Sequence, residues 1–116
     1  GLEFPFISHK TISDAINTIS IFDADSLISV RPENSLFFQH DGEGMKPILN
    51  MDKFTKLERE ALYKNIGGIM LATRDFFETN KLLLGGKVSH IVVGQKESIG
   101  VFTKFDLKIA NAVAEF

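Results

Sequence analysis

Residues 88–107 read VSHIVVGQKESIGVFTKFDL, and the rest of the chain is interpreted outward from them. Residues 88–93 are a β-branched apolar run, residues 94–97 are a polar break, and residues 98–105 are a second apolar run. This pattern predicts two strands joined by a tight turn. Asp106 then precedes apolar residues at helical spacing. Because an Asp side chain accepts bonds from the free N–H groups of a first helical turn, Asp106 is predicted to cap a helix.

The composition limits the classes of function. The chain has 116 residues, 44% of them hydrophobic, which suffices for one compact unit or for two very small ones that share a core. The formal net charge of -2 argues against a nucleic-acid partner, which requires a basic face. No apolar run approaches the roughly 20 residues that span a bilayer, so no membrane partner is expected. The absence of Cys excludes disulfides and fits a cytoplasmic location.

A first helix is expected near the amino end, after a short extended piece at residues 5–8. Thr11 begins a motif similar to a capping box, with Asp14 three positions later. The apolar residues that follow at helical spacing are Ile12, Ala15, Ile16 and Ile19. The helix is therefore predicted to begin after Thr11 and to end at the acidic residues 23–25.

A hairpin is expected next. Residues 26–30 predict a strand and residues 35–39 predict its return strand. Residues 31–34 predict the turn between them, because Pro fixes one dihedral angle and Asn tolerates the next. Residues 41–44 are an acidic loop. Pro47 argues against a central strand after this loop, so a short strand or an ordered connection is expected there.

The middle of the chain contains a second helix signal and then an ambiguity. Thr55 opens a capping box, and the inward-facing residues after it are Leu57, Ala61 and Leu62. Gly67 and Gly68 follow, and two glycines inside a helix cost about 2 kcal/mol relative to alanine. Either one helix covers residues 55–80, or the helix stops and residues 69–71 begin a new strand. We favour the second interpretation because of a repeat in the sequence.

A further helix is expected over residues 73–84 in the favoured interpretation, with Gly85 and Gly86 as its C-terminal stop. In the rival interpretation these two glycines form a hairpin turn. The segment carries more apolar residues than one helix face buries, namely Phe76, Phe77, Leu82, Leu83 and Leu84. We expect most of them in the core and some on the surface of a homodimer.

The repeat is a match of pattern rather than of identical residues. A shift of 63 residues, from residue 27 to residue 90, places predicted strand on strand and turn on turn. Each half then reads β-α-β-β-α. The pattern predicts an α+β fold with two small sheets packed with about four helices, and with repeats at residues 5–65 and 66–116.

Two segments resemble motifs of one family. Residues 11–19, TISDAINTI, resemble the opening of the first helix of cystathionine-β-synthase (CBS) domains. Residues 99–107, IGVFTKFDL, resemble the second-hairpin motif of that family, in which Gly, two apolar residues, Thr, two variable residues, Asp and an apolar residue follow one another. Together with the repeat, they make nearly the whole chain similar to a tandem CBS pair. Residues 37–41, FFQHD, lack the Gly and Thr of the motif, so the first site is expected to be degenerate.

The resemblance implies a non-enzymatic regulatory module that binds an adenine nucleotide (AMP, ADP or ATP) between its repeats and biases an attached or partner protein. The family's motif Thr and Asp contact ribose and phosphate, and the matching residues here are Thr103 and Asp106. Gly100 and Lys104 of the same motif complete the predicted ligand site. A carboxylate suits ribose hydroxyls, and a helix N-terminus favours a phosphate. As a helix cap alone, however, Asp106 would contribute about 1 kcal/mol.

Other interpretations stay open. The single helix over residues 55–80 would make the chain similar to roadblock/dynein light-chain domains, which are dimeric protein-interaction scaffolds without a ligand. Helical backbone at residues 66–71 favours that scaffold, and extended backbone favours the repeat. A structural spacer that has lost binding is a third interpretation. No catalytic residues and no metal site are expected, because His9, His40 and His90 lack the close pairing typical of zinc ligands.

Overall fold

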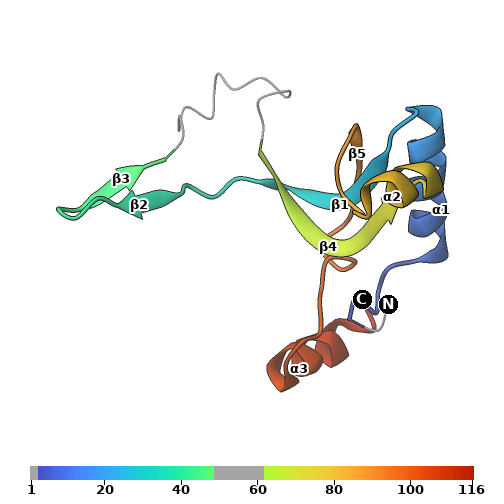
Figure 1. Cartoon of the computed structure of the whole chain (residues 1–116). Coiled ribbons are helices and arrows are strands. Elements are labelled where there is room, and N and C mark those ends of the chain that lie inside the picture. Colours follow the sequence, from blue (N-terminus) through green and yellow to red (C-terminus); the bar gives the residue numbers. More distant parts are fainter. Residues whose placement is uncertain (1–2, 49–61) are drawn as a thin grey trace. The chain divides into compact units, whose positions relative to one another are not determined.

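The computed structural model describes residues 3–48 and 62–116 (Figure 1). The described elements are α1 His9–Ile21, β1 Ser26–Glu33, β2 Phe38–His40, β3 Met45–Pro47, β4 Leu62–Ala72, α2 Arg74–Asn80, β5 Val88–Val92 and α3 Lys104–Val113. One sheet has the strand order β4-β1-β5, and the other pairs β2 with β3. The predicted α+β class with two small sheets is confirmed. The start of the helix predicted at Thr55 lies outside the described residues, and Leu62, expected on that helix, begins β4.

Contacts divide the chain into two compact units. The larger unit comprises Gly1–Arg31 and Asn65–Phe116, and the smaller unit comprises Pro32–Lys64. The larger unit contains the three helices of the described chain, the N-terminal segment and most of the three-stranded sheet. The smaller unit contains the β2–β3 hairpin.

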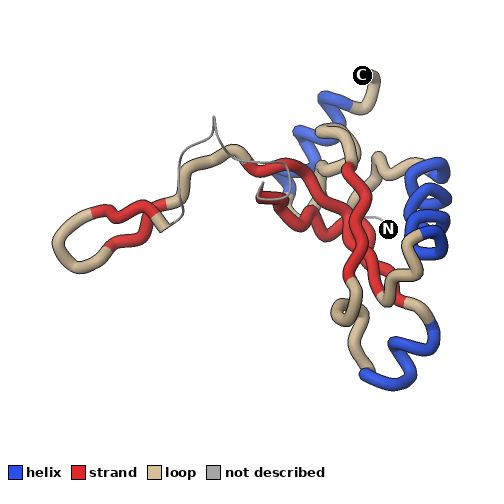
Figure 2. Tube along the Cα trace, turned by 90° about the horizontal axis from the view of Figure 1, so that it is seen from above, coloured by secondary structure: helices blue, strands red, loops and turns tan. Residues whose placement is uncertain are grey.

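The central strand β1 pairs with β5 in parallel. Strands are drawn red in Figure 2, where those of this sheet lie close together. Leu27 lies opposite Ser89, and Val30 lies opposite Val92. Parallel neighbours need a crossover connection rather than a tight turn. Strands of both predicted repeats, residues 5–65 and 66–116, therefore share one sheet. Among the described residues, the first half begins with α1 rather than with a strand, and the second half has one strand rather than two between α2 and α3.

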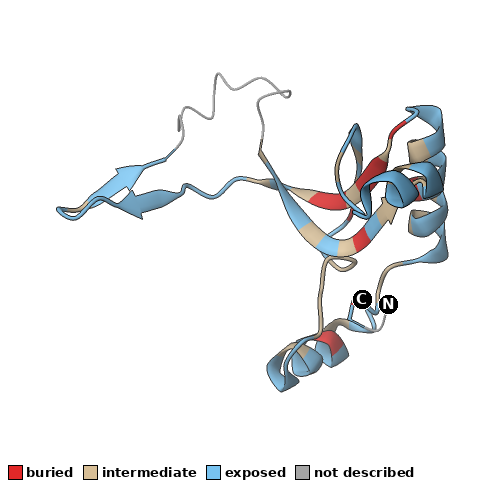
Figure 3. Ribbon diagram, in the orientation of Figure 1, coloured by how far each residue is buried: buried red, intermediate tan, exposed pale blue. Residues whose placement is uncertain are grey.

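Helix α1 packs along one face of this sheet, where the core lies (Figure 3). Ala15 of α1 and Leu27 of β1 are fully buried and touch Ile69 of β4, which is 6% exposed. Partly buried residues around this cluster are Ile7, Ile19, Leu71 and Ile91. The buried hydroxyl of Ser29 accepts a hydrogen bond from the Ile69 N–H at 2.9 Å, so this polar group is satisfied inside the core. Full burial of a side chain such as Leu27 stabilises the fold by about 2 kcal/mol.

The hairpin predicted over residues 88–105 is wrong in its second half. Strand β5 is present, but residues 94–99 form successive turns in which the Ser98 N–H donates to two carbonyl groups of the same loop, at 3.1 and 3.2 Å. The Val101 N–H donates to the carbonyl oxygen of Glu3 at 2.6 Å rather than to β5. The apolar run after the break therefore packs as a loop against the N-terminal segment.

The hairpin predicted over residues 26–39 is also wrong. Strand β1 continues through residues 31–33, where the turn was expected. Phe38–His40 pairs antiparallel with Met45–Pro47 instead, so the acidic loop is the true turn of a different hairpin. The Asp41 carboxylate accepts two backbone N–H groups across that turn, both at 2.9 Å. Strand β3 confirms one of the two alternatives for the segment that contains Pro47.

Strand β4 is extended through Gly67 and Gly68. The single helix over residues 55–80 is therefore wrong over residues 62–72, and the strand expected at residues 69–71 is confirmed. Gly67 has a φ of 83°, a left-handed conformation that suits glycine. A Cβ at Gly68 would lie only 2.6 Å from Cδ1 of Ile7. The two glycines thus provide a backbone kink and a close approach within a strand.

Helix α2 is shorter than the helix predicted over residues 73–84. Its cap is Thr73, and it ends early because Lys81 adopts a left-handed conformation with a φ of 57°. Gly85 and Gly86 are therefore not its stop and lie in the loop before β5. Four of the apolar residues that were mostly expected in the core are 39–57% exposed, namely Phe77, Leu82, Leu83 and Leu84.

Replacement of Gly68 by Ala is expected to lower the free energy of unfolding by about 1–3 kcal/mol, because the added methyl group would overlap Ile7 and the Phe4 ring. Urea denaturation followed by circular dichroism measures this change. Gly94→Ala is the matched control, since an added Cβ there has no atom within 4 Å. Its effect should stay within about 0.5 kcal/mol. Equal effects of the two substitutions would contradict the close packing at Gly68.

Candidate functional site

Thr103 and Asp106, two of the predicted ligand contacts, form a capping box at the start of α3. The Thr103 hydroxyl oxygen accepts the Asp106 N–H at 3.1 Å. One carboxylate oxygen of Asp106 accepts the N–H groups of Phe102 at 3.0 Å and Thr103 at 3.2 Å. Thr103 is therefore the cap, and the prediction of Asp106 as the cap is wrong by three residues. The helix predicted from the apolar spacing after Asp106 is confirmed as α3.

The other two predicted contacts, Gly100 and Lys104, lie on the same short segment in different surroundings. Lys104 is the exposed first residue of α3. A Cβ at Gly100 would lie 2.6 Å from Cε2 of Phe102 and 3.1 Å from Cε1 of Phe4. These two rings meet edge to face, with 5.8 Å between their centroids. Aromatic packing therefore accounts for the glycine, whether or not a ligand binds nearby.

A groove lies between residues 95–99 and the C-terminal half of α3. Its volume is about 550 Å³, which is within the range of small-molecule sites. The residues that line it are Gln95, Lys96, Ser98, Ile99, Ile109, Val113 and Phe116. Apolar side chains supply most of this lining, and Lys96 supplies a positive charge. The groove suits a ligand with an apolar body and an anionic group.

The Lys96 ammonium group sits at the C-terminal end of α3. It donates to the carbonyl oxygens of Phe116 at 3.2 Å and Ala114 at 3.4 Å. It also lies 5.0 Å from the centroid of the Phe6 ring, a cation–π contact. A cation at this end of a helix is favourable because the helix dipole is negative there. Since an ammonium group has three N–H donors, it can hold both carbonyls and still donate to an anion in the groove.

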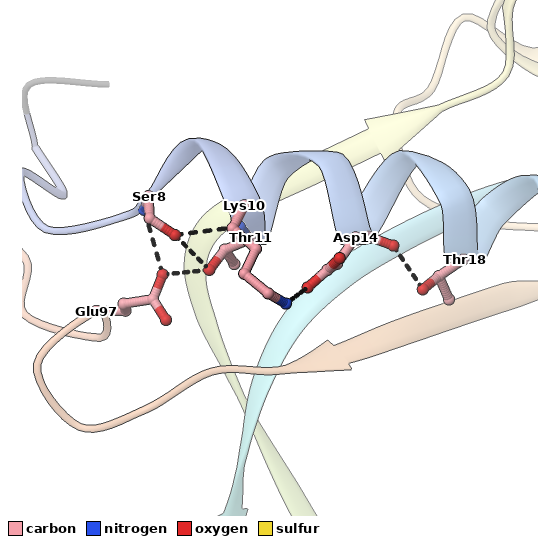
Figure 4. Close-up of polar contacts among 6 residues, drawn as sticks. All are labelled: Ser8, Lys10, Thr11, Asp14, Thr18 and Glu97. Atoms are coloured by element: carbon pink, nitrogen blue, oxygen red, sulfur yellow. Dashed lines mark hydrogen bonds and ion pairs between the residues drawn. The ribbon is translucent and has the colours of Figure 1, made fainter.

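The adjacent Glu97 binds the start of α1 (Figure 4). Its carboxylate accepts the Ser8 N–H at 3.3 Å and the Thr11 hydroxyl at 2.5 Å. Ser8 is the cap of α1, because its hydroxyl oxygen accepts the Thr11 N–H at 3.1 Å. The prediction of Thr11 as the cap is therefore wrong. A carboxylate at the positive end of α1 complements the helix dipole.

Asp14, expected to complete a capping box with Thr11, pairs instead with Lys10 (Figure 4). Their nitrogen and oxygen atoms are 2.7 Å apart on the surface of α1. The hydrogen bond and the charge of Asp14 raise the pKa of Lys10. This exposed pair stabilises α1 locally and does not contribute a binding site.

A second hollow, of about 500 Å³, lies on the hairpin of the smaller unit. It is lined by Gln39, His40, Asp41, Lys46, Pro47 and Ile48. The backbone N–H groups of Glu43 and Gly44 lower the pKa of Asp41 by hydrogen bonding to its carboxylate. Nδ1 of His40 accepts the Gly42 N–H at 3.0 Å. The polar groups of this hollow therefore hold the turn in place.

Within residues 3–48 and 62–116, no three His, Asp or Glu side chains are grouped so that they could hold a metal ion. In the same part of the chain, no helix is both long and apolar enough to cross a membrane. No protein-family model matches the sequence, and no curated protein matches it. The resemblance to CBS domains stays a prediction based on the motifs themselves.

Sequence reasoning missed the roles of Lys96 and Glu97. Both residues lie in the polar break at residues 94–97, which the pattern presents as an ordinary turn. Their opposite charges are adjacent in the sequence, but the helix ends that they bind are distant in the chain. Only the fold shows that the positive end of α1 and the negative end of α3 lie beside this loop.

Replacement of Thr103 by Ala is expected to destabilise the larger unit by about 1 kcal/mol, because α3 loses its cap. Urea denaturation measures the loss. Thr103→Ser keeps the hydroxyl group and should retain most of the stability. If the Ser variant lost as much stability as the Ala variant, the hydroxyl hydrogen bond would not be the cause.

The stability of the β2–β3 hairpin is expected to depend on pH through Asp41. Because folding lowers the pKa of Asp41, its stabilising contribution is present above the unfolded-state pKa of 3.8 and is lost as the pH falls through the lower folded-state pKa. An NMR titration should show the Asp41 carboxyl signal and the amide signals of Glu43 and Gly44 moving together. Asp41→Asn should remove this shared titration. Protonation of Asp41 at its ordinary pKa of 3.8 would contradict the turn hydrogen bonds.

Proposed function

We propose that this chain is a non-enzymatic regulatory module that binds a small ligand in the groove beside α3. The observation that carries the proposal is the groove itself, about 550 Å³ in volume, mainly apolar and with the Lys96 ammonium group in its lining. An adenine nucleotide has the matching chemistry, since its base is flat and largely apolar and its phosphate is anionic. AMP, ADP and ATP are therefore the first ligands to test.

Thr103 and Asp106 have a smaller part in this proposal than the sequence predicts. Their oxygen atoms already accept the N–H groups at the start of α3. A ribose or phosphate contact at those atoms would compete with the capping box. The groove residues Ile109 and Phe116 lie toward the other end of the helix. The predicted contacts at Gly100, Thr103, Lys104 and Asp106 therefore stay a separate hypothesis.

The loop of residues 94–99 could couple ligand binding in the groove to a change in the positions of α1 and α3. It contributes Lys96 to the groove and Glu97 to the start of α1. A ligand that favours one position of this loop would shift the population of positions that α1 and α3 adopt. Such a shift would bias an attached chain or a partner protein. We place this module in the cytoplasm, in keeping with the absence of Cys.

A protein-interaction scaffold without a ligand is the second candidate function. Phe77 and the run Leu82, Leu83 and Leu84 favour it, because these large apolar side chains are 39–57% exposed. The single long helix of roadblock/dynein light-chain domains is not part of this candidate, since β4 is extended through residues 62–72. A homodimer or a heterologous partner would both use such a surface.

Calorimetric titration with AMP, ADP and ATP tests the ligand proposal. At least one nucleotide should bind saturably, and Lys96→Met should weaken that binding about tenfold or more, because a charge-assisted hydrogen bond contributes about 1.5 kcal/mol. Lys108→Met is the matched control, since it removes the same charge from α3 outside the groove lining.

If none of the three nucleotides gave a binding signal in the calorimetric titration, the nucleotide proposal would be wrong. Binding that Lys96→Met and Lys108→Met weaken equally would place the nucleotide outside the groove. In that case Thr103→Ser and Asp106→Asn would test the alternative position at the start of α3.

A further inference from the structure

The ring of Phe4 occupies a slot built largely from glycines. Phe4 is 8% exposed, although it lies near the beginning of the chain and outside every helix and strand. Gly67 and Gly68 of β4 border the ring, and so does Gly100. Phe102 meets the ring edge to face, with 5.8 Å between centroids. Two segments far apart in the sequence therefore converge on one side chain.

The glycines are necessary for the ring to fit. A Cβ at Gly68 would lie 3.2 Å from Cδ1 of Phe4, and a Cβ at Gly100 would lie 3.1 Å from Cε1 of the same ring. Both distances are shorter than an ordinary van der Waals contact between carbon atoms. At Gly67, an added Cβ would be 3.8 Å from Cζ of the ring. The slot thus has a shape that accepts an aromatic ring and excludes side chains from its own walls.

The rest of residues 3–8 is held as a short peptide ligand would be. The Glu3 carbonyl oxygen accepts the Val101 N–H at 2.6 Å. The Phe6 ring lies under the Lys96 ammonium group, and the Ser8 N–H donates to Glu97 at 3.3 Å. Beside the apolar anchor Phe4, the segment therefore has one backbone hydrogen bond and two charge-assisted contacts near the surface. Recognition of peptides by other proteins uses the same combination.

We propose that this slot is a peptide-binding site for a short segment with a phenylalanine anchor. Residues 3–6 occupy the site within the chain, and a phenylalanine-bearing segment of a partner protein can replace them, while Ile7 and Ser8 stay at the core and at the start of α1. Exchange of the segment would release the contact of Lys96 with Phe6 and the hydrogen bond between the Val101 N–H and the Glu3 carbonyl oxygen. The inference does not depend on nucleotide binding, because the slot and the groove have different linings.

The test uses the ¹⁵N-labelled chain with Phe4→Leu, which weakens the internal anchor, and a synthetic peptide of residues 3–8, EFPFIS, with blocked ends. The peptide should shift the amide signals of Gly68 and Gly100 saturably in NMR spectra. A peptide with Ala at the position of Phe4 should cause at least tenfold smaller occupancy at equal concentration. The unmodified chain should respond at least tenfold more weakly than Phe4→Leu, because its own segment fills the slot.

Gly100→Ala in the Phe4→Leu background provides a matched control, because the added methyl group enters the slot. It should abolish the peptide response. The proposal is overturned if millimolar EFPFIS leaves the Gly68 and Gly100 signals unchanged, or if the Ala peptide shifts them equally. Should Phe4→Leu unfold the chain, EFPFIS must restore the folded circular dichroism spectrum; no recovery at millimolar peptide also overturns the proposal. Calorimetric titration of the unmodified chain with AMP, ADP and ATP tests the nucleotide proposal independently. The peptide proposal can therefore fail while the nucleotide proposal holds, and the reverse.

Discussion

The packing of the Phe4 ring against Gly67, Gly68 and Gly100 holds three segments of the larger unit together. Phe4 is nearly buried, and it is the point where the N-terminal segment, the kinked strand β4 and the segment before α3 meet. A methyl group on Gly68 or Gly100 would compete with the ring for space. The positions of β4 and of the start of α3 are therefore both tied to one aromatic side chain.

Two adjacent charges extend this arrangement to the helix ends. Glu97 accepts hydrogen bonds from Ser8 and Thr11 at the positive end of α1, and Lys96 donates to Phe116 at the negative end of α3. Both pairings complement the helix dipole, and each contributes about 0.3–1 kcal/mol at an exposed site. The loop that carries these charges also forms a wall of the groove beside α3. A single short loop thus connects two helix ends with the proposed ligand site.

Local sequence patterns predicted where helices and strands lie better than they predicted which strands pair with one another. Apolar spacing located α1, β1 and α3, and the repeat correctly favoured a strand at residues 69–71. The hairpins failed because alternating apolar residues indicate an extended segment but do not say which strand it joins. The parallel pairing of β1 with β5 depends on a contact across more than half of the chain, which no local pattern contains.

The residues of the candidate site were predictable from the sequence only where their contacts lie within a few residues of them in the chain. The motif around Thr103 and Asp106 does mark the start of α3, yet the hydroxyl group rather than the carboxylate provides the cap. The same uncertainty affected α1, where Ser8 and Thr11 are hydroxyl residues three positions apart and either suits a cap. Lys96 and Glu97 were missed because their partners come from distant segments. Gly100 was assigned to a ligand, whereas Phe4 and Phe102 explain its lack of a side chain.

The most direct measurement of the Phe4 contact is the two-dimensional NMR spectrum of the unmodified chain in solution. Protons of the Phe4 ring should show nuclear Overhauser effects to the Hα protons of both Gly68 and Gly100, and ring currents should shift those Hα signals away from their ordinary positions. A Phe4 ring with no such effects, and glycine Hα signals at ordinary positions, would contradict the slot and the joining of the three segments that depends on it.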